Sequence, residues 1–332
     1  MLGLEWTAIW MVLGFLFAAY SVIGNDSIQT LGTFIASNQK TKWYYLWAFA
    51  ALILVVTLSF SFFGGTPGDI SSGRLQKIPF IEIQWYHAMG PLVLVLLTRI
   101  GVPVSTSLLV LSSFAPSLIF GEILTKSALG YGIAAVVAYL LWVAIFKWDN
   151  KRNPVPQDKE FKWRVMQWCA TGFLWYTWLS HDIANIAVFL PRELSLWQFG
   201  LVLLVFVTGL AYIIWRRGGK IQRIVLEKMH TNYLRSATII DLCYGIILFV
   251  FKELNSIPMS TTWVFIGLLS GRELAMYSRM KDYEFKDFFP IVGKDMLRLL
   301  FGLAVSILIA VAIQNPQVFV DFVSDLQNLL HY

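Results

Sequence analysis

Long apolar runs separated by short polar segments dominate this chain. Two of the runs are interrupted by polar residues, and two others, 103–119 and 258–270, are short and begin at proline. A helix needs about 20 apolar residues to cross a bilayer, so the short runs either span or re-enter. The pattern predicts an all-α polytopic membrane protein with about ten spans, including broken or re-entrant half-helices. The runs lie near 5–38, 44–63, 82–99, 103–119, 131–146, 165–192, 196–215, 236–252, 258–270 and 297–314.

Composition supports the membrane interpretation. Of the 332 residues, 57% are hydrophobic and 14% are charged, and mean hydropathy is +0.64. A soluble domain carries about 25% charged residues, so too few are present to cover a soluble surface. This excludes a soluble enzyme, a nucleic-acid-binding protein and a secreted disulfide scaffold. Cys169 and Cys243 both lie in apolar stretches, which argues against a disulfide framework.

The net charge of +6 comes from basic residues whose positions indicate membrane orientation and not nucleic-acid binding. If segment 147–164 is cytoplasmic, alternation of the spans places 21 of the 26 Lys and Arg residues on that side. Cytoplasmic loops carry an excess of basic residues. We therefore expect ten crossings with both termini outside, in the plasma membrane.

Two sequence motifs recur at nearly the same spacing. Residues 25–29 (NDSIQ) have a counterpart in 181–185 (HDIAN), and residues 103–107 (PVSTS) have one in 258–262 (PMSTT), each about 155 residues later. Each half then holds an odd number of spans, so the halves must point in opposite directions. Inverted repeats with interrupted helices are typical of secondary transporters. The predicted units are a first repeat (1–146), a basic cytoplasmic linker (147–164), a second, inverted repeat (165–314) and an amphipathic tail (315–332).

Asp26 and Asp182 lie in the middle of apolar sequence, where a carboxylate is costly and needs a partner. Gly24 and Ser180 precede them and favour a local unwinding that frees backbone carbonyls. Carboxylate, amide and carbonyl oxygens together suit a hard cation, so Na⁺ is a candidate at both aspartates. A buried aspartate that only joins helices is the simpler alternative, and the duplication favours function. The candidate cation ligands are Asn25, Asp26, Gln29, His181, Asp182 and Asn185.

The two proline-led motifs, 103–107 and 258–262, have the residue types of helix starts. Serine and threonine suit the cap, and the unpaired N–H groups of a helix start attract anions. Two such starts facing each other would suit a tetrahedral oxyanion without a buried Lys or Arg. Ordinary capping of two short helices is the alternative. The candidate anion ligands are Ser105, Thr106, Ser107, Ser260, Thr261 and Thr262.

These residues resemble the inorganic phosphate transporter family, which also includes sulfate permeases. That family carries duplicated Gly-Ala-Asn-Asp-Val-Ala-Asn and Pro-Val-Ser-Thr-Thr motifs in inverted repeats. Here Asn25-Asp26 is followed by a similar Gly32-Thr33 and Ser37, and residues 182–185 match the Asp-Val-Ala-Asn core. The resemblance covers both halves and implies cation-coupled symport of an oxyanion, with the Asn/Asp sets as ligands in the sodium-coupled members.

The chain departs from the family pattern at three positions. Gln29 and His181 each stand where the motif has Asn, and Ser107 stands where it has Thr. An imidazole beside a carboxylate suits a proton carrier more than a sodium ligand. The coupling ion is therefore Na⁺ or H⁺, and we expect no other cofactor.

Other polar residues inside the apolar runs are candidates for a path or a gate. His87 and Asp241 lie within one residue of equivalence in the two halves and either line the path or join helices. Glu122, Arg272 and Glu273 follow the proline-led helices near the interface, where solvated helix ends are the alternative. The set of path or gate candidates is Thr33, His87, Glu122, Asp241, Arg272 and Glu273.

The leading hypothesis is import of inorganic phosphate with a cation by alternating access at the repeat interface, and not an enzymatic activity. Sulfate, or another tetrahedral oxyanion, is the alternative within the same class. A remote alternative is an intramembrane aspartyl protease built on Asp26 and Asp182, and a passive channel also stays open. The expected partners are the oxyanion and the lipid bilayer, with a homodimer among the candidate assemblies and no nucleic acid.

Overall fold

The computed structural model describes residues 2–76, 78–100, 104–115, 117–145, 155–219, 222, 234–254, 259–279 and 288–314. Within these ranges every regular element is helical, which confirms the all-α class. The helices are α1 (Leu2–Ser21), α2 (Ser27–Ser37), α3 (Trp43–Gly64), α4 (Met89–Ile100), α5 (Thr106–Val110), α6 (Ser117–Ile145), α7 (Gln157–Asp182), α8 (Ala184–Ala187), α9 (Leu196–Trp215), α11 (Leu234–Leu254), α12 (Thr261–Arg279) and α13 (Phe288–Gln314).

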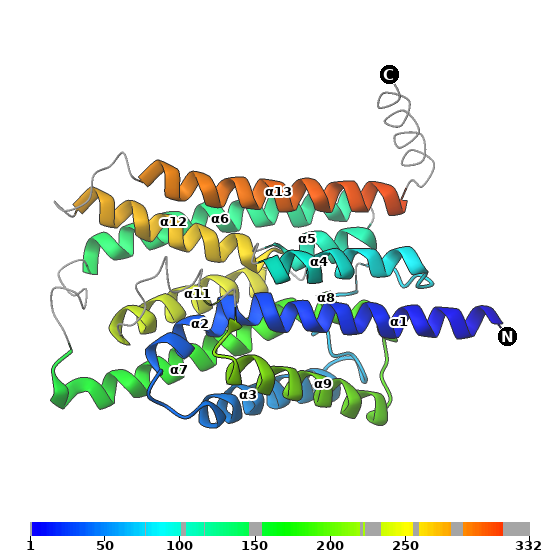
Figure 1. Cartoon of the computed structure of the whole chain (residues 1–332), viewed down its shortest axis with the longest axis horizontal. Coiled ribbons are helices and arrows are strands. Elements are labelled where there is room, and N and C mark those ends of the chain that lie inside the picture. The colour runs from blue at the N-terminus through cyan, green and yellow to red at the C-terminus, as the bar shows by residue number, and fades with distance from the viewer. Residues whose placement is uncertain are drawn as a thin grey trace, which may run out of the picture.

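Six helical segments in the described part of the chain are long and apolar enough to cross a membrane by length and composition. They are Trp6–Ser37, Trp43–Gly64, Ile119–Ile145, Leu196–Trp215, Leu234–Phe251 and Phe288–Gln314. The helices lie roughly along one axis as an elongated bundle (Figure 1). The chain is thus a multi-pass membrane protein.

The interrupted run 5–38 does not unwind at Gly24 as expected. Instead of opening at Gly24, the chain continues from α1 to α2 through a π-helical turn, η1 (Val22–Asp26). A π turn widens the helix by one residue and is frequent at functional sites. In the second half, α7 ends at Asp182 and α8 begins at Ala184, so the break there is a single residue.

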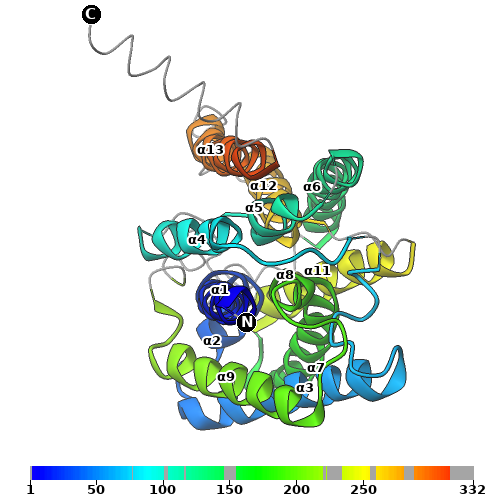
Figure 2. The ribbon, with the colours of Figure 1, turned by 90° about the vertical axis from the view of Figure 1, so that its right-hand side faces the viewer.

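The 82–99 and 103–119 runs form a helical hairpin. The 12 residues of α4 reach about 18 Å at 1.5 Å per residue, against a hydrocarbon core of about 30 Å. A Cβ on Gly90, at the start of α4, would lie 3.1 Å from the carbonyl oxygen of Leu109, near the end of α5. The two helices are therefore antiparallel, and they lie side by side in Figures 1 and 2. This part of the chain enters and leaves the bundle at one end.

A second hairpin is formed by α11 and α12, which begins in the interior of the bundle. The Tyr244 hydroxyl of α11 donates to the carbonyl of Thr261 at the start of α12, with 2.9 Å between the oxygens. Helix α12 then packs along α6, and α11 along α7. The described parts of both proline-led segments, from Val104 and from Met259, thus lie inside the bundle, and Pro103 and Pro258 lie outside the described residues.

The end of α2 and the start of α7 lie at the left end of Figure 1, with the end of α12 and the start of α13. The start of α1 and the end of α13 lie at the opposite end. Helix α7 begins at Gln157, so the later part of the predicted linker is helical. The predicted tail 315–332 lies outside the described residues.

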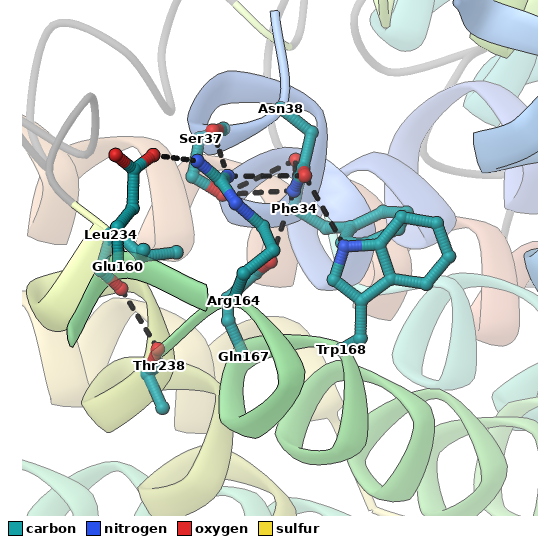
Figure 3. Close-up of polar contacts among 9 residues, drawn as sticks. All are labelled: Phe34, Ser37, Asn38, Glu160, Arg164, Gln167, Trp168, Leu234 and Thr238. Carbon is teal, nitrogen blue, oxygen red and sulfur yellow. Dashed lines mark hydrogen bonds and ion pairs between the residues drawn. The ribbon is translucent and has the colours of Figure 1, made fainter. Parts of the chain in front are cut away.

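A polar cluster joins α2 to α7 at the left end of the bundle (Figure 3). Asn38, just after α2, donates to the Gln167 side chain and accepts from Arg164 and Trp168, at distances between 2.9 and 3.2 Å. Arg164 also donates to the carbonyl of Ser37 at 2.6 Å and pairs with Glu160. This cluster fixes the end of α2, the helix that begins directly after Asp26.

Candidate functional site

The Asp26 side chain lies against the start of α5. Thr106 donates its hydroxyl proton to one carboxylate oxygen, and Asn25 donates its amide to the other at 2.7 Å. The Asn25 amide also reaches the carbonyl of Val104 at 3.0 Å. The Asn-Asp pair of the first motif is therefore joined to the first Ser-Thr motif, about 80 residues away in sequence.

Asp182 has the equivalent arrangement in the second half. Thr261 donates to one carboxylate oxygen at 2.6 Å, and Asn185 donates to the other at 2.8 Å. Ser107, from the first half, adds a contact to the same carboxylate at 3.4 Å. The two predicted cation sets therefore meet the two predicted anion sets at one place.

The starts of α5 and α12 contact each other reciprocally. The Ser107 hydroxyl donates to the carbonyl of Met259 at 3.1 Å, and the Thr262 hydroxyl donates to the carbonyl of Val104 at 3.4 Å. Each contact crosses from one motif to the other. The two helix starts therefore face each other, as the sequence predicts.

The six hydroxyls of the two motifs take three different roles. Ser105 and Ser260 cap their helices by accepting from the N–H groups of Leu108 and Trp263, at 3.1 and 3.2 Å. The two threonines that follow bind the aspartates, and the third residue of each motif makes the reciprocal contact. Each of the six candidate hydroxyls thus already donates or accepts a hydrogen bond within the protein.

Two more candidate ligands, Gln29 and His181, form hydrogen bonds with residues other than the two aspartates. The Gln29 amide donates to the Asn25 side-chain oxygen at 3.0 Å, which orients Asn25 toward Asp26. His181 places Nε2 2.7 Å from the carbonyl oxygen of Leu248 in α11. This distance requires Nε2 to carry a proton and donate it.

All twelve candidate ligands are buried. Their exposed fractions run from 0% at Asn25 and Asn185 to 5% at Ser105. The two carboxylates are close enough to repel each other electrostatically. The site is therefore occluded, and any solute that binds here needs a movement of the surrounding helices to enter.

The path and gate candidates lie around this centre. Asp241 of α11 accepts from Thr33 of α2 and Thr171 of α7 and therefore joins three helices. His87 lies in the 3-10 turn η2 (Trp85–Ala88), where its Nδ1 accepts from the N–H of Gln84 and caps the turn. Asp241 therefore joins helices, and His87 stabilises a turn, which are the structural alternatives to lining a path.

Arg272 and Glu273 pair with each other on α12 at 3.0 Å, and the Arg272 guanidinium lies over the ring of Trp142. Glu122 lies half-buried on α6. The Arg272–Glu273 ion pair therefore lies within α12, and Arg272 packs on Trp142 of α6.

Sequence reasoning missed Arg74. It lies in the loop after α3, but its side chain is 3% exposed and its Nη2 lies 3.5 Å from His181 Nε2. A second missed residue is Ser127 of α6, whose hydroxyl oxygen accepts from the N–H of Ser260 at 2.8 Å. Neither belongs to a repeated motif, so no pattern in the sequence marks them.

Comparison with solved structures identifies the fold. A structure titled "The sodium-dependent phosphate transporter" superposes with a TM-score of 0.60, covering 93% of this chain and 98% of that one at 16% identity. The chain therefore has the fold of a phosphate transporter. No protein-family model and no curated protein matches the sequence. The fold implied by the resemblance of the motifs is thereby confirmed on independent grounds.

Proposed function

We propose that the protein imports inorganic phosphate together with a cation, Na⁺ or H⁺. The observation that carries this proposal is the pairing of Thr106 with Asp26 and of Thr261 with Asp182 where the two helix starts meet. The phosphate transporter fold supports the substrate class. We assign the protein to the plasma membrane with both termini outside.

The contacts of the two threonines suggest how binding is coupled. In the occluded state each hydroxyl proton points to a carboxylate, so it is unavailable to an anion. A cation that binds the carboxylate oxygens competes with the hydroxyl for the same lone pairs and repels its proton. The hydroxyl then turns toward the space between the helix starts, where the N–H groups already attract negative charge. Cation binding thus creates the anion site.

Charge balance gives the same order of events. Two carboxylates buried in a low-dielectric site repel a phosphate anion, because little water is present there to screen their charge. Neutralising a carboxylate with a cation removes that repulsion. Phosphate uptake without the cation is therefore unfavourable, which is the basis of coupling.

The contacts also support two inverted repeats that move against each other. Thr106 corresponds to Thr261, Val104 to Met259 and Ser107 to Thr262, and the members of each pair make equivalent bonds. We assign alternating access to a rocking of one repeat-derived bundle against the other around this site. The reciprocal contacts of Ser107 and Thr262 lie across the interface that would have to shift.

The experiment is uptake of labelled phosphate into proteoliposomes under an imposed Na⁺ or proton gradient. One of the two gradients should drive uptake, and collapsing it with an ionophore should stop uptake. Phosphate flux that is equal with and without both gradients would mean a passive channel and would overturn the proposal.

Sulfate is the second candidate substrate, because it has the same tetrahedral shape and the hydroxyl and N–H donors suit both anions. Phosphate at neutral pH keeps a proton to donate, and the carboxylates of Asp26 and Asp182 can accept it, whereas sulfate has only acceptors. We therefore expect excess sulfate to compete weakly with labelled phosphate. Complete inhibition by equimolar sulfate would assign the protein to sulfate.

A further inference from the structure

A compact turn outside the helices directs one arginine into the bundle. The Asp69 carboxylate accepts from the N–H groups of Ser71 and Gly73, at 2.6 and 3.1 Å. Ser72 and Gly73 have φ angles of 55° and 76°, in the left-handed region that residues other than glycine rarely adopt. The N–H of Arg74 then donates to the carbonyl of Ser71 at 3.1 Å and closes the turn. The turn therefore fixes the direction of the Arg74 side chain.

Arg74 approaches the second half of the site. Its guanidinium Nη2 lies 3.5 Å from Nε2 of His181, the residue before Asp182, and its charge interacts favourably with the Asp182 carboxylate. Only 3% of Arg74 is exposed, so water screens this charge little. An arginine keeps its charge at any physiological pH. Asp182 therefore lies in the field of a permanent cation.

The first half of the site has a different charge balance. The groups that act on Asp26 are the hydroxyl of Thr106, the amide of Asn25 and the negative charge of Asp182. Among the residues that the structure describes, these influences on Asp26 include no cationic side chain. The two aspartates differ in two ways: Asp182 has an additional contact from Ser107, and the charge of Arg74 acts on Asp182 but is not among the influences on Asp26.

A buried carboxylate that lacks a counter-charge is strongly unfavourable. In a site with two such carboxylates, two bound cations would balance the charge. Where the protein supplies one positive charge itself, a second cation would add an uncompensated charge to the same low-dielectric volume.

We propose that Arg74 is the built-in counter-charge of Asp182, so that one coupling cation binds, at Asp26, in each transport cycle. This inference rests on the proposed cation-coupled phosphate transport. It replaces the expectation of one cation at each aspartate. His181 then acts as a spacer between Arg74 and Asp182, with its Nε2–H donated to the carbonyl of Leu248.

The test is the number of cations transported per phosphate. Proteoliposomes are loaded with a fixed outward-directed phosphate gradient at zero membrane potential, and the opposing cation gradient that gives zero net flux is measured. For one cation per phosphate, that cation gradient equals the phosphate gradient, and for two cations it is the square root of it. Wild-type protein should give one, Arg74→Gln should give two, and Arg74→Lys, which keeps the charge, should give one.

Arg192→Gln is the matched control. Arg192 is also a loop arginine, but its guanidinium donates to the carbonyls of Ile78 and Pro79, at 3.0 and 3.2 Å. This variant should keep the wild-type value of one cation per phosphate.

Several results would overturn the proposal. Two cations per phosphate in the wild type would do so whether or not any variant folds. An Arg74→Gln variant that keeps one cation while losing affinity for phosphate would make Arg74 an anion ligand instead. If Arg74→Gln folds but does not transport, adding Asp182→Asn should restore transport with one cation, and continued inactivity would contradict the counter-charge role. Absence of gradient-driven uptake by the wild type would instead contradict the proposed function.

Discussion

Thr106 and Asp26 show how far a sequence motif determines a site at the scale of single residues. The repeated Asn-Asp and Ser-Thr motifs single out both residues as candidates, because a carboxylate inside an apolar run needs a partner. Which hydroxyl would meet which carboxylate was not predictable, since the two lie 80 residues apart. Arg74 was not predictable at all, because its direction depends on a turn built by Asp69 and on a left-handed Ser72.

Replacing Thr106 tests the role of its hydroxyl. Thr106→Val keeps the shape of the side chain but removes the donor to Asp26. A hydrogen bond to a charged group contributes about 1.5–3 kcal/mol, so we expect the affinity for the cation or for phosphate to change by roughly 10- to 100-fold in uptake assays. Thr106→Ser should stay close to wild type.

Thr57→Val is the matched control for this substitution. Thr57 is 4% exposed and donates only within its own helix, to the carbonyl of Ile53 at 2.7 Å. A Thr57→Val effect as large as that of Thr106→Val would mean that the loss is general and not specific to the site.

At the scale of elements, the best predictions were the long, uniformly apolar helices. The run 196–215 matches α9 (Leu196–Trp215), and 44–63 matches α3 within one residue at each end. The shorter runs were harder, because about a dozen apolar residues fit both a buried half-helix and part of a span. The hairpin of α4 and α5 and the π turn at Asp26 depend on packing against neighbouring helices, which hydropathy does not report.

Close packing of α12 on α6 gives a prediction at this scale. A Cβ on Gly267 would lie 2.3 Å from the carbonyl oxygen of Tyr131, and one on Gly271 would lie 1.9 Å from that of Ala135. These glycines are four residues apart and let the two backbones meet, as small residues do between membrane helices. Gly271→Ala should destabilise the protein by about 1–3 kcal/mol or more, seen as a lower thermal midpoint in detergent.

Gly132→Ala, on α6, is the control. No atom lies within 4 Å of a Cβ placed there, and alanine favours a helix more than glycine does. Its thermal midpoint should equal or exceed that of the wild type. A Gly271→Ala midpoint no lower than the control's would contradict the close contact.

At the scale of the whole molecule, the distribution of basic residues predicted orientation. The basic segments at the end of α2 and the start of α7 do lie at one end of the bundle, and the start of α1 and the end of α13 lie at the other (Figure 1). Under the positive-inside rule, the first of these ends is the one we propose to be cytoplasmic. Because the candidate site is buried, the proposed transport would need a movement of the helices, which hydropathy cannot predict.

Cysteine labelling tests this orientation. In a variant without Cys169 and Cys243, Lys40→Cys lies at the predicted inner end and Glu193→Cys at the outer end, and both positions are exposed. A membrane-impermeant maleimide added to intact cells should label Glu193→Cys at once and Lys40→Cys only after permeabilisation. The reverse pattern would invert the topology.

The central claim is that a cation at the Asp26 carboxylate drives phosphate uptake. The most direct measurement is gradient-driven accumulation of labelled phosphate in proteoliposomes by wild type, by Asp26→Asn and by the control Asp295→Asn. Asp295 is also buried, at 5% exposure, but it pairs with Arg298 on α13. We predict that Asp26→Asn remains folded, as judged by gel filtration, and accumulates no phosphate, whereas Asp295→Asn accumulates it as the wild type does. Near-normal accumulation by folded Asp26→Asn would contradict the account.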